Sequence, residues 1–409
     1  MRDTTSGIPA GRGLDLPGTG NEPGHWSRRW HLWILALWTL ICFVHFARNG
    51  GVAWHFFTQG SALLFGGPPG ARSVPGASHA RTLPGGLHLY ANYPQLQIGP
   101  VAFVITEGLR QLGPHQGVFA TEAVLTAAGL YLVYALERIA LIVRPDVGRQ
   151  CAAFRGTLLV GGAVFLAGWA ELTATFTHLD DAVALILGVL AVRAAVAGRP
   201  VLAGVCVGLA TDAKPWALVF LPVVFMLPVR AWGRAVAGAL AAIAVAWLPF
   251  ALADPHTVAA THYTIRNLPG SALRALGVRD PRTPSWDRSA QLVLGWALAA
   301  AAVWRRRWPA VVLLGVGARI ALDPADHGYY TAGILLGALL WDLLGPRRLL
   351  PVCTVTSYAA LTAVHAVTRD SALLGQLRLS LVIALAAVIL LAPPWPWVSV
   401  PADNPALSP

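Results

Sequence analysis

Long apolar runs recur along this chain from residue 30 almost to its C-terminal end. Many of them approach the roughly 20 residues that a helix needs to cross ~30 Å of hydrocarbon. The mean hydropathy is +0.59 and only 12% of the residues are charged, whereas a soluble domain carries about twice that share of charge. The pattern predicts an all-α integral membrane protein.

Boundaries formed by Arg, Pro, Gly and Asp divide the apolar sequence into about twelve predicted transmembrane helices. They cover residues 30–47, 117–143, 157–176, 181–197, 201–213, 215–229, 232–252, 289–304, 309–322, 328–344, 349–367 and 374–392. No small-residue cleavage site follows the first run, so we expect a retained helix and not a cleaved signal peptide. The predicted membrane domain covers 28–394, between a disordered tail at 1–27 and a second tail at 395–409.

Arginines gather on alternate connections between these predicted helices. They are Arg28 and Arg29, those within 138–155, Arg193 and Arg199, Arg230 and Arg234, Arg305 to Arg307, and Arg347 and Arg348. The positive-inside rule assigns these connections to the cytoplasm, which places both termini there. Because orientation accounts for the formal charge of +11, we expect no nucleic-acid partner.

The remaining connections are predicted to be extracytoplasmic, and two of them are long. The first, residues 48–116, is rich in Gly, Pro, His and aromatic residues, and loops of that length are usually functional. Its apolar part, residues 98–113, is short and charged, so we expect an interfacial helix; a crossing there would place the arginines of 138–155 outside. The second long outer loop is 253–288.

Two adjacent acids open the apolar run FTHLDDAVALILGVL. The predicted orientation places His178, Asp180 and Asp181 at an outer helix end, where water reaches them and full burial of charge is avoided. Neighbouring carboxylates repel, so one holds its proton more tightly, which suits a base beside a positioning group. The alternative is that one Asp caps the helix and interacts favourably with its dipole.

Lys214 is the only lysine among the 30 lysines and arginines of the chain. It lies between the runs 201–213 and 215–229, which are too short to cross the bilayer unaided. We therefore expect this junction to be recessed in a protein-lined cavity. A lysine retained in an arginine-rich chain suggests a need for a compact point charge, for example on a phosphate, with chance survival as the alternative.

Several common chemistries find no support in the sequence. No Walker A loop, GxGxxG loop or GxSxG elbow occurs, so neither an ATP-driven protein nor a Ser-His-Asp hydrolase is indicated. The four cysteines show no CxxC spacing, and we expect neither a disulfide nor a metal-thiolate site.

The segment HLDDAVALILGVLAVRAAVAGRPVLAGVCVGLATDAKPWALVFLPVVF, residues 178–225, resembles the middle of the GT-C glycosyltransferases that use polyprenyl-phosphate sugars. It is most similar to glycosyltransferase family 87, the actinobacterial mannosyltransferase-like group. The shared pattern is an acidic head, a basic turn and a GxxxGLAxxxKPxA pair of short helices. The last part is carried by Gly204, Gly208, Leu209, Ala210, Lys214, Pro215 and Ala217.

This resemblance implies a GT-C-like enzyme of the bacterial cytoplasmic (inner) membrane. Such an enzyme moves a hexose, here expected to be mannose, from a polyprenyl-phosphate donor to a lipid or cell-envelope glycan, inverting the anomeric carbon on the extracytoplasmic face. An acid deprotonates the acceptor and cations stabilise the leaving phosphate. Asp180 and Asp181 are the expected catalytic acids. The expected phosphate ligands are Lys214, Arg266 and His262.

The sequence departs from the family in the first outer loop. Related enzymes carry a catalytic Asp soon after the first helix, whereas residues 47–106 contain no Asp or Glu. His55 is the candidate replacement in that loop because histidine titrates in a suitable range. The pair Asp180 and Asp181 is the candidate outside it.

Two further outer segments, HYTIRNLPG and DPADHGYYTAG, mix His, Arg, Asp and Tyr. Tyrosines there either stack on a sugar or belong to an interfacial belt. Some relatives need a divalent cation, but the DxxDH spacing from Asp323 is nonspecific, so we assign no metal site. The residues expected to contact sugar or acceptor are His178, Tyr263, Asp326, His327 and Tyr329.

Two other functions stay open. The missing loop acid favours a non-catalytic GT-C-like protein that binds or translocates polyprenyl-linked glycolipids. An ion-coupled transporter would need ionisable residues within the membrane and inverted repeats. Glu122, Glu171 and Arg319 are the few candidates for such residues, and no repeat is visible.

Overall fold

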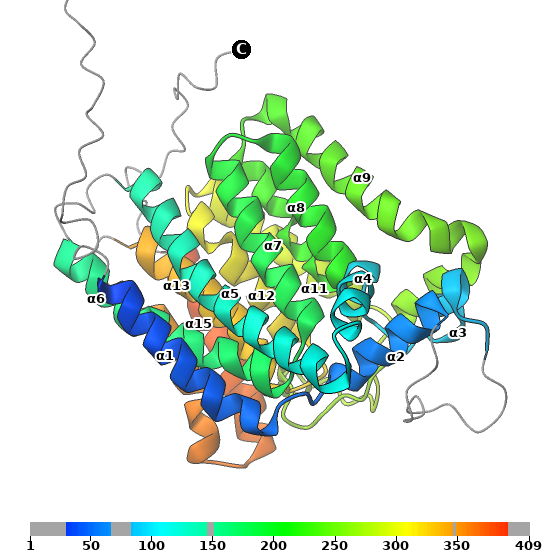
Figure 1. Cartoon of the computed structure of the whole chain (residues 1–409). Coiled ribbons are helices and arrows are strands. Elements are labelled where there is room, and N and C mark those ends of the chain that lie inside the picture. The colour runs from blue at the N-terminus through cyan, green and yellow to red at the C-terminus, as the bar shows by residue number, and fades with distance from the viewer. Residues whose placement is uncertain (1–29, 67–82, 145–150, 347–348, 392–409) are drawn as a thin grey trace, which may run out of the picture.

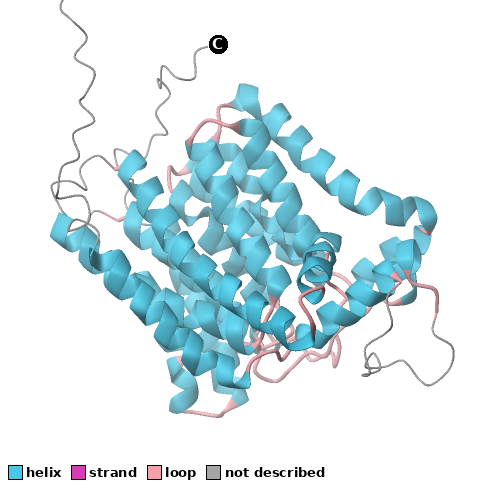
Figure 2. Cartoon of the chain, in the orientation of Figure 1, coloured by secondary structure: helices cyan, strands magenta, loops and turns pink. Residues whose placement is uncertain are grey.

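The computed structural model describes residues 30–66, 83–144, 151–346 and 349–391 (Figure 1). The main helices are α1 (Trp30–Phe46), α5 (Pro114–Val143), α6 (Cys151–Ala170), α7 (Leu179–Val196), α8 (Pro200–Ala213), α9 (Val229–Ala253), α11 (Asp287–Trp304), α12 (Val311–Leu322), α13 (Thr331–Leu344), α14 (Val352–Leu361) and α15 (Ser371–Leu391). No strand occurs within those residues, and Figure 2 shows helices joined by loops. The predicted all-α class is confirmed.

Five helical stretches in the described residues are long and apolar enough to cross a membrane. They are Trp30–Asn49, Pro114–Val143, Ala152–Thr175, Val229–Ala253 and Ser371–Leu391. Shorter apolar helices cover Pro200–Ala213, Pro215–Met226, Trp308–Leu322, Gly328–Leu344 and Val352–Ala366. These helices fit a membrane-embedded protein, but their lengths do not establish about twelve crossings.

The helices differ sharply in how much apolar surface they expose. Every residue of α13 is buried, whereas α9 exposes Val245 at 80% and Leu252 at 77%. In Figure 1, α9 runs along the edge of the bundle and diverges from it. Exposed apolar surface on that scale would promote aggregation in water, and it suits contact with lipid tails.

Small residues bring α8 and α9 close together, as expected for helices packed in lipid. A Cβ atom placed on Gly204 would lie only 1.8 Å from the carbonyl oxygen of Ala235, and one on Gly208 would lie 2.6 Å from that of Ala239. The GxxxG part of the motif therefore has a packing role, because backbone approaches backbone at both positions.

The segment 48–116, predicted to be an outer loop, contains more regular structure than the sequence indicated. Helix α2 (Trp54–Phe65) follows η2 (Ala47–Asn49) soon after α1, and α3 (Leu89–Asn92) follows η3 (Gly86–His88). The apolar segment 98–113 forms the separate short helix α4 (Pro100–Arg110), as predicted.

Helix α4 packs against α2 through a glycine. A Cβ atom on Gly60 would overlap the ring of Phe103, which is fully buried, whereas the adjacent Val104 is 59% exposed. Helix α4 therefore buries one side, and it also contacts α5 and α8 of the bundle.

The short apolar element η6 (Pro215–Met226) is a 3-10 helix of 12 residues. A 3-10 helix rises roughly 2.0 Å per residue, so it is about 24 Å long, against about 18 Å for an α-helix of the same length. The segment is therefore less short than an α-helical reading of its sequence suggested. The remaining elements are η7 (Pro255–His262), α10 (Ala272–Ala275), η8 (Trp308–Ala310), η9 (Gly328–Tyr330) and η10 (Ala363–Ala366).

Candidate functional site

The connection between α6 and α7 has two uncommon backbone features. Its first part, η5 (Glu171–Thr175), is a π-helix, an element that occurs frequently at functional sites. Thr177 then adopts a positive φ of 52°, which is rare for a β-branched residue. Hydrogen bonds hold this turn, because Thr177 Oγ1 accepts from Gly51 N and donates to Glu122 Oε1. The strained turn directly precedes His178.

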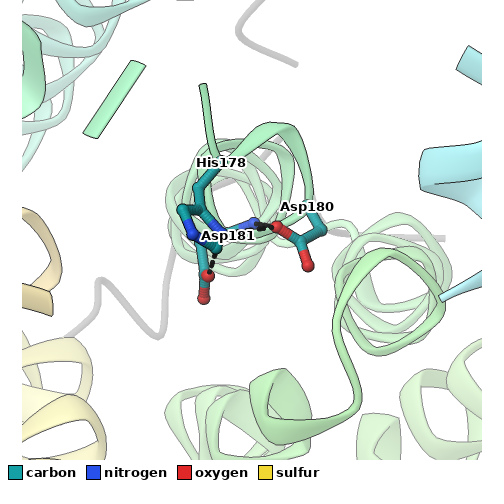
Figure 3. Close-up of side chains that lie close together, drawn as sticks. All are labelled: His178, Asp180 and Asp181. Atoms are coloured by element: carbon teal, nitrogen blue, oxygen red, sulfur yellow. Dashed lines mark hydrogen bonds and ion pairs between the residues drawn. The ribbon is translucent and has the colours of Figure 1, made fainter. Parts of the chain in front are cut away.

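The head of α7 presents His178, Asp180 and Asp181 together, and Figure 3 shows the two carboxylates directed apart. Both acids are buried, at 0% and 3% exposure. The Asp181 backbone N–H donates to Asp180 Oδ1 over 2.8 Å. The N-cap of α7 is His178, and no side chain in the described part of the chain makes a capping bond there, so the alternative that one Asp caps the helix is wrong. The helix dipole still favours negative charge in the first turn, where both acids lie.

Lys214 pairs with Asp180 across the α7 and α8 interface. Its Nζ lies 2.5 Å from Asp180 Oδ2, and its side chain is 17% exposed. The residue before a proline avoids the helical region, and Lys214 is accordingly extended (φ −147°, ψ 116°), which ends α8. Pro215 thus ends α8 at a point where the single lysine reaches the acid pair.

Asp181 is held by two donors from elsewhere in the chain. Its Oδ1 accepts from Trp216 Nε1 over 2.6 Å and from Arg319 Nη1 over 3.2 Å. Its Oδ2 has no hydrogen-bond partner and lies 3.5 Å from His178 Nδ1. One oxygen is therefore fully engaged, and the other faces only the imidazole.

Arg319, on α12, is enclosed on both faces by aromatic rings. Its guanidinium carbon lies 4.2 Å from the centre of the Trp216 ring and 4.4 Å from that of Tyr330. Its Nε lies 3.5 Å from Asp323 Oδ2. Cation–π contacts of this kind are strongest when desolvated. The sequence indicates Arg319 only as a candidate intramembrane charge of a transporter, and the structure places it within the acid cluster.

Tyr329 covers the imidazole of His178 with its ring, at 3.9 Å between centroids and 23° between planes. On η9, Tyr329 also stacks with His327, at 5.2 Å and 10°. Of the residues expected to contact sugar or acceptor, His178 and Tyr329 are therefore in direct contact, and His327 lies one ring further away.

Other predicted site residues lie apart from the acid pair. Arg266 is exposed and forms an isolated backbone bridge with Arg282; within the described residues, no ion pair joins it to either acid. Tyr263 is 37% exposed, and its carbonyl accepts from Gln97. The side chain of His262 lies outside the described part of the chain.

Asp326 and His55 also make their contacts elsewhere. The backbone carbonyl of Asp326 accepts from Arg378 over 2.6 Å, and its Oδ2 lies beside Gly270 of the second outer loop. His55, on α2, stacks on its neighbour Phe56. The structure thus brings the acids, His178, Lys214 and Tyr329 together, but not these residues.

An acid does reach the start of the first outer loop, although it comes from α5. The carboxylate of Glu122 lies directly beneath Gly50, where a Cβ atom would overlap it. The local sequence does not indicate this contact, because Glu122 is more than 70 residues from Gly50 along the chain. Glu122 is 5% exposed, and its carboxylate accepts the hydrogen bond of Thr177 that stabilises the turn.

The donor types of the cluster suit a hard cation, and the ligand atoms of His178, Asp180 and Asp181 lie within 4.8 Å of one another. However, Lys214 already faces one carboxylate and Arg319 the other. A divalent ion would lie against two cations in a buried site. The charge arrangement therefore does not fit a metal, and we derive no step through one.

A hollow of about 10 Å³ lies beside Asp181, Arg319 and Tyr329. Small-molecule pockets usually enclose roughly 300–1,000 Å³, so this hollow would have to widen to admit a lipid-linked sugar. It connects the acid cluster to the aromatic residues of η9.

The chain matches no protein-family model, no curated protein and no solved structure. Any functional conclusion therefore depends on the residues themselves and on the resemblance in sequence at positions 178–225.

Proposed function

We propose that this protein is a membrane glycosyltransferase. It would move a hexose, mannose in our proposal, from a polyprenyl-phosphate donor to a lipid or cell-envelope glycan on the extracytoplasmic face. The single observation that carries the proposal is the convergence of the head of α7 with Lys214 and Arg319. Charged side chains from three separate segments meet there inside a largely apolar helical bundle. Ionisable residues in such surroundings are costly and usually functional.

The sidedness of the proposal is supported by the distribution of arginines along the site helices. Arg193 ends α7 at the opposite end from the acids, and Arg199 precedes α8 at the opposite end from Lys214. Arg305 to Arg307 precede η8 and α12, whose far end carries Asp323. The positive-inside rule then puts the acid cluster outside and both termini inside. About twelve crossings in a bacterial cytoplasmic membrane belong to the same proposal.

The proposed roles follow from charge and exposure. Lys214 engages one carboxylate, and its ammonium group has three hydrogens, so it retains donors for the phosphate of a donor lipid. The tyrosine ring over His178 suits stacking against a sugar. The head of α7 supplies the base that accepts the proton of the acceptor hydroxyl.

A second function is favoured by two observations. The first outer loop has no acid between residues 47 and 106, and the hollow at the cluster is small. A non-catalytic protein that binds or translocates polyprenyl-linked glycolipids would keep the phosphate-binding Lys214 without needing a base.

A transfer assay separates the two functions. Purified protein in liposomes is incubated with labelled polyprenyl-phosphate-mannose and a bacterial envelope lipid extract. We expect labelled product, and we expect Asp180→Asn and Asp181→Asn each to lower its rate by about 10²-fold or more. Asp280→Asn, at an exposed acid outside the cluster, is the matched control and should retain the full rate. Donor binding without product would support the non-catalytic function, and equal rates in all variants would remove the acids from the mechanism.

A further inference from the structure

We propose that His178, and neither aspartate, is the group that accepts the proton of the acceptor hydroxyl. The two carboxylates are then positioning residues that orient the imidazole. This inference rests on the proposed function, and it differs from the sequence analysis, which named Asp180 and Asp181 as the catalytic acids and His178 as a contact of the sugar or acceptor.

Access to the acceptor distinguishes the three side chains. The Asp180 side chain is 0% exposed and that of Asp181 is 5% exposed, whereas 18% of the His178 side chain is exposed. A base must come within hydrogen-bond reach of the proton it removes. An acceptor hydroxyl can therefore meet the imidazole without the rearrangement that either buried acid would require.

The contacts of each carboxylate point the same way. Asp180 is engaged by Lys214 through one oxygen and by the backbone of α7 through the other. Asp181 Oδ1 accepts from Trp216 and Arg319. Charge-assisted hydrogen bonds of this type stabilise the ionised form. Carboxylates held in this way are poor proton acceptors.

One oxygen of each carboxylate faces the same ring nitrogen of His178. Its Nδ1 is buried and makes no hydrogen bond within the described residues, but it lies 3.4 Å from Asp180 Oδ1 and 3.5 Å from Asp181 Oδ2. Among the described residues, its Nε2 has no hydrogen-bond partner. Because negatively charged oxygens attract an N–H group, the two carboxylates favour the tautomer that carries its proton on Nδ1. The lone pair is then on Nε2, the nitrogen available to a ligand.

Tyr329 and the backbone fix the orientation of the ring. Tyr329 stacks on one face at 3.9 Å, and Phe57 approaches edge-on at 6.4 Å. The backbone N–H of His178 donates to the carbonyl of Leu172 at the π-helix. The strained turn at Thr177 thus places the imidazole, and not an acid, at the exposed edge of the cluster.

The reaction balances with these roles. The acceptor O–H bond breaks and its proton moves to His178 Nε2, while the acceptor oxygen forms a bond to the anomeric carbon. The bond from that carbon to the phosphate oxygen breaks, and its electron pair leaves with the polyprenyl phosphate. The products are a glycoside, a phosphomonoester with one more negative charge, and an imidazolium between two carboxylates. Lys214 faces the charge that develops on the phosphate in our proposal.

The pH dependence of kcat/KM provides a test that needs no variant. An imidazole base gives an acid limb centred roughly at pH 6–7, whereas a carboxylate base gives one centred nearer pH 4. The titratable or charged groups around the imidazole are Asp180, Asp181, Lys214, Arg319, His327 and Tyr329.

Chemical rescue provides the second test. His178 is the N-cap of α7 without a side-chain capping bond, and glycine is tolerated at that position, so His178→Gly should fold. We expect its kcat to fall by on the order of 10²–10⁴ and added imidazole to restore roughly tenfold or more of the loss. The matched control is His115→Ala, at an exposed histidine on α5. Its kcat should equal that of the wild-type protein, and added imidazole should not alter it.

Each outcome decides the matter. A wild-type limb near pH 4, or full activity in His178→Gly, would overturn the role of His178 and leave the transferase proposal standing. A limb near pH 6–7 supports it even if His178→Gly does not fold or is not rescued. Absence of product from the wild-type protein would instead overturn the transferase proposal, and the inference with it.

Discussion

Arg319 offers the sharpest structural prediction, because it neutralises a buried carboxylate. Met has a side chain of similar length but no charge. The replacement would leave Asp181, at 3% exposure, with only Trp216 as a hydrogen-bond donor. Removing one partner of a buried ion pair costs roughly 3–5 kcal/mol, and the lost contacts with Trp216 and Tyr330 add to this. We expect the free energy of unfolding of Arg319→Met to fall by at least about 3 kcal/mol.

A double-mutant cycle distinguishes charge pairing from packing. The double variant Asp181→Asn/Arg319→Met leaves neither position with an unpaired charge. Its loss of unfolding free energy should therefore be smaller than the sum of the losses in the two single variants, by roughly 1–3 kcal/mol. Unfolding is followed by tryptophan fluorescence as SDS is titrated into detergent micelles. Arg193→Met, at an exposed arginine of α7, is the matched control and should cost less than about 0.5 kcal/mol. Additive costs within about 0.5 kcal/mol would refute the pairing.

Two further predictions concern helix packing and acid stability. Gly204→Leu should prevent α8 from approaching α9, because a Cβ atom there would already lie 1.8 Å from the Ala235 oxygen. The control Gly233→Leu places its side chain in open space. Gly204→Leu should therefore lower the yield of monodisperse protein on size-exclusion chromatography relative to Gly233→Leu, and equal yields would contradict this. Hydrogen bonds from Arg110 and Ser61 lower the pKa of Glu107 on α4 to about 2. Its folded pKa is thus below its unfolded value, so its contribution to stability is present above about pH 4.5 and is lost as pH falls towards 2. Glu107→Gln should flatten the pH dependence of thermal unfolding in that window, and an unchanged profile would count against this ion pair.

Much of the helical framework could be read from the sequence. The predicted helix 181–197 corresponds to α7 at Leu179–Val196, and 232–252 corresponds to α9 at Val229–Ala253. Apolar runs with proline, glycine and arginine at their ends leave few other possibilities for a backbone in lipid. Helix α2 was not predicted, because its short apolar run lies between glycines and polar residues.

The site was only partly predictable, for reasons of distance along the chain. Lys214 could be placed because Pro215 ends α8 beside it, and the acids because they begin α7. Arg319 is 138 residues from Asp181, and nothing in the local sequence of α12 indicates which helix it faces. Trp216 reads as one more apolar residue of η6, and its role depends on where its indole N–H points.

The central claim is that the head of α7, Lys214 and Arg319 form a site for a lipid-borne phosphodiester on the extracytoplasmic side. A cryo-EM structure in nanodiscs with a non-hydrolysable polyprenyl-phosphate-mannose analogue tests it most directly. We predict the phosphate within about 4 Å of Lys214 Nζ, the distance of an ion pair, and the sugar between that phosphate and His178. A donor bound away from this cluster, or entering it from the leaflet that the arginine-rich connections face, would contradict the account.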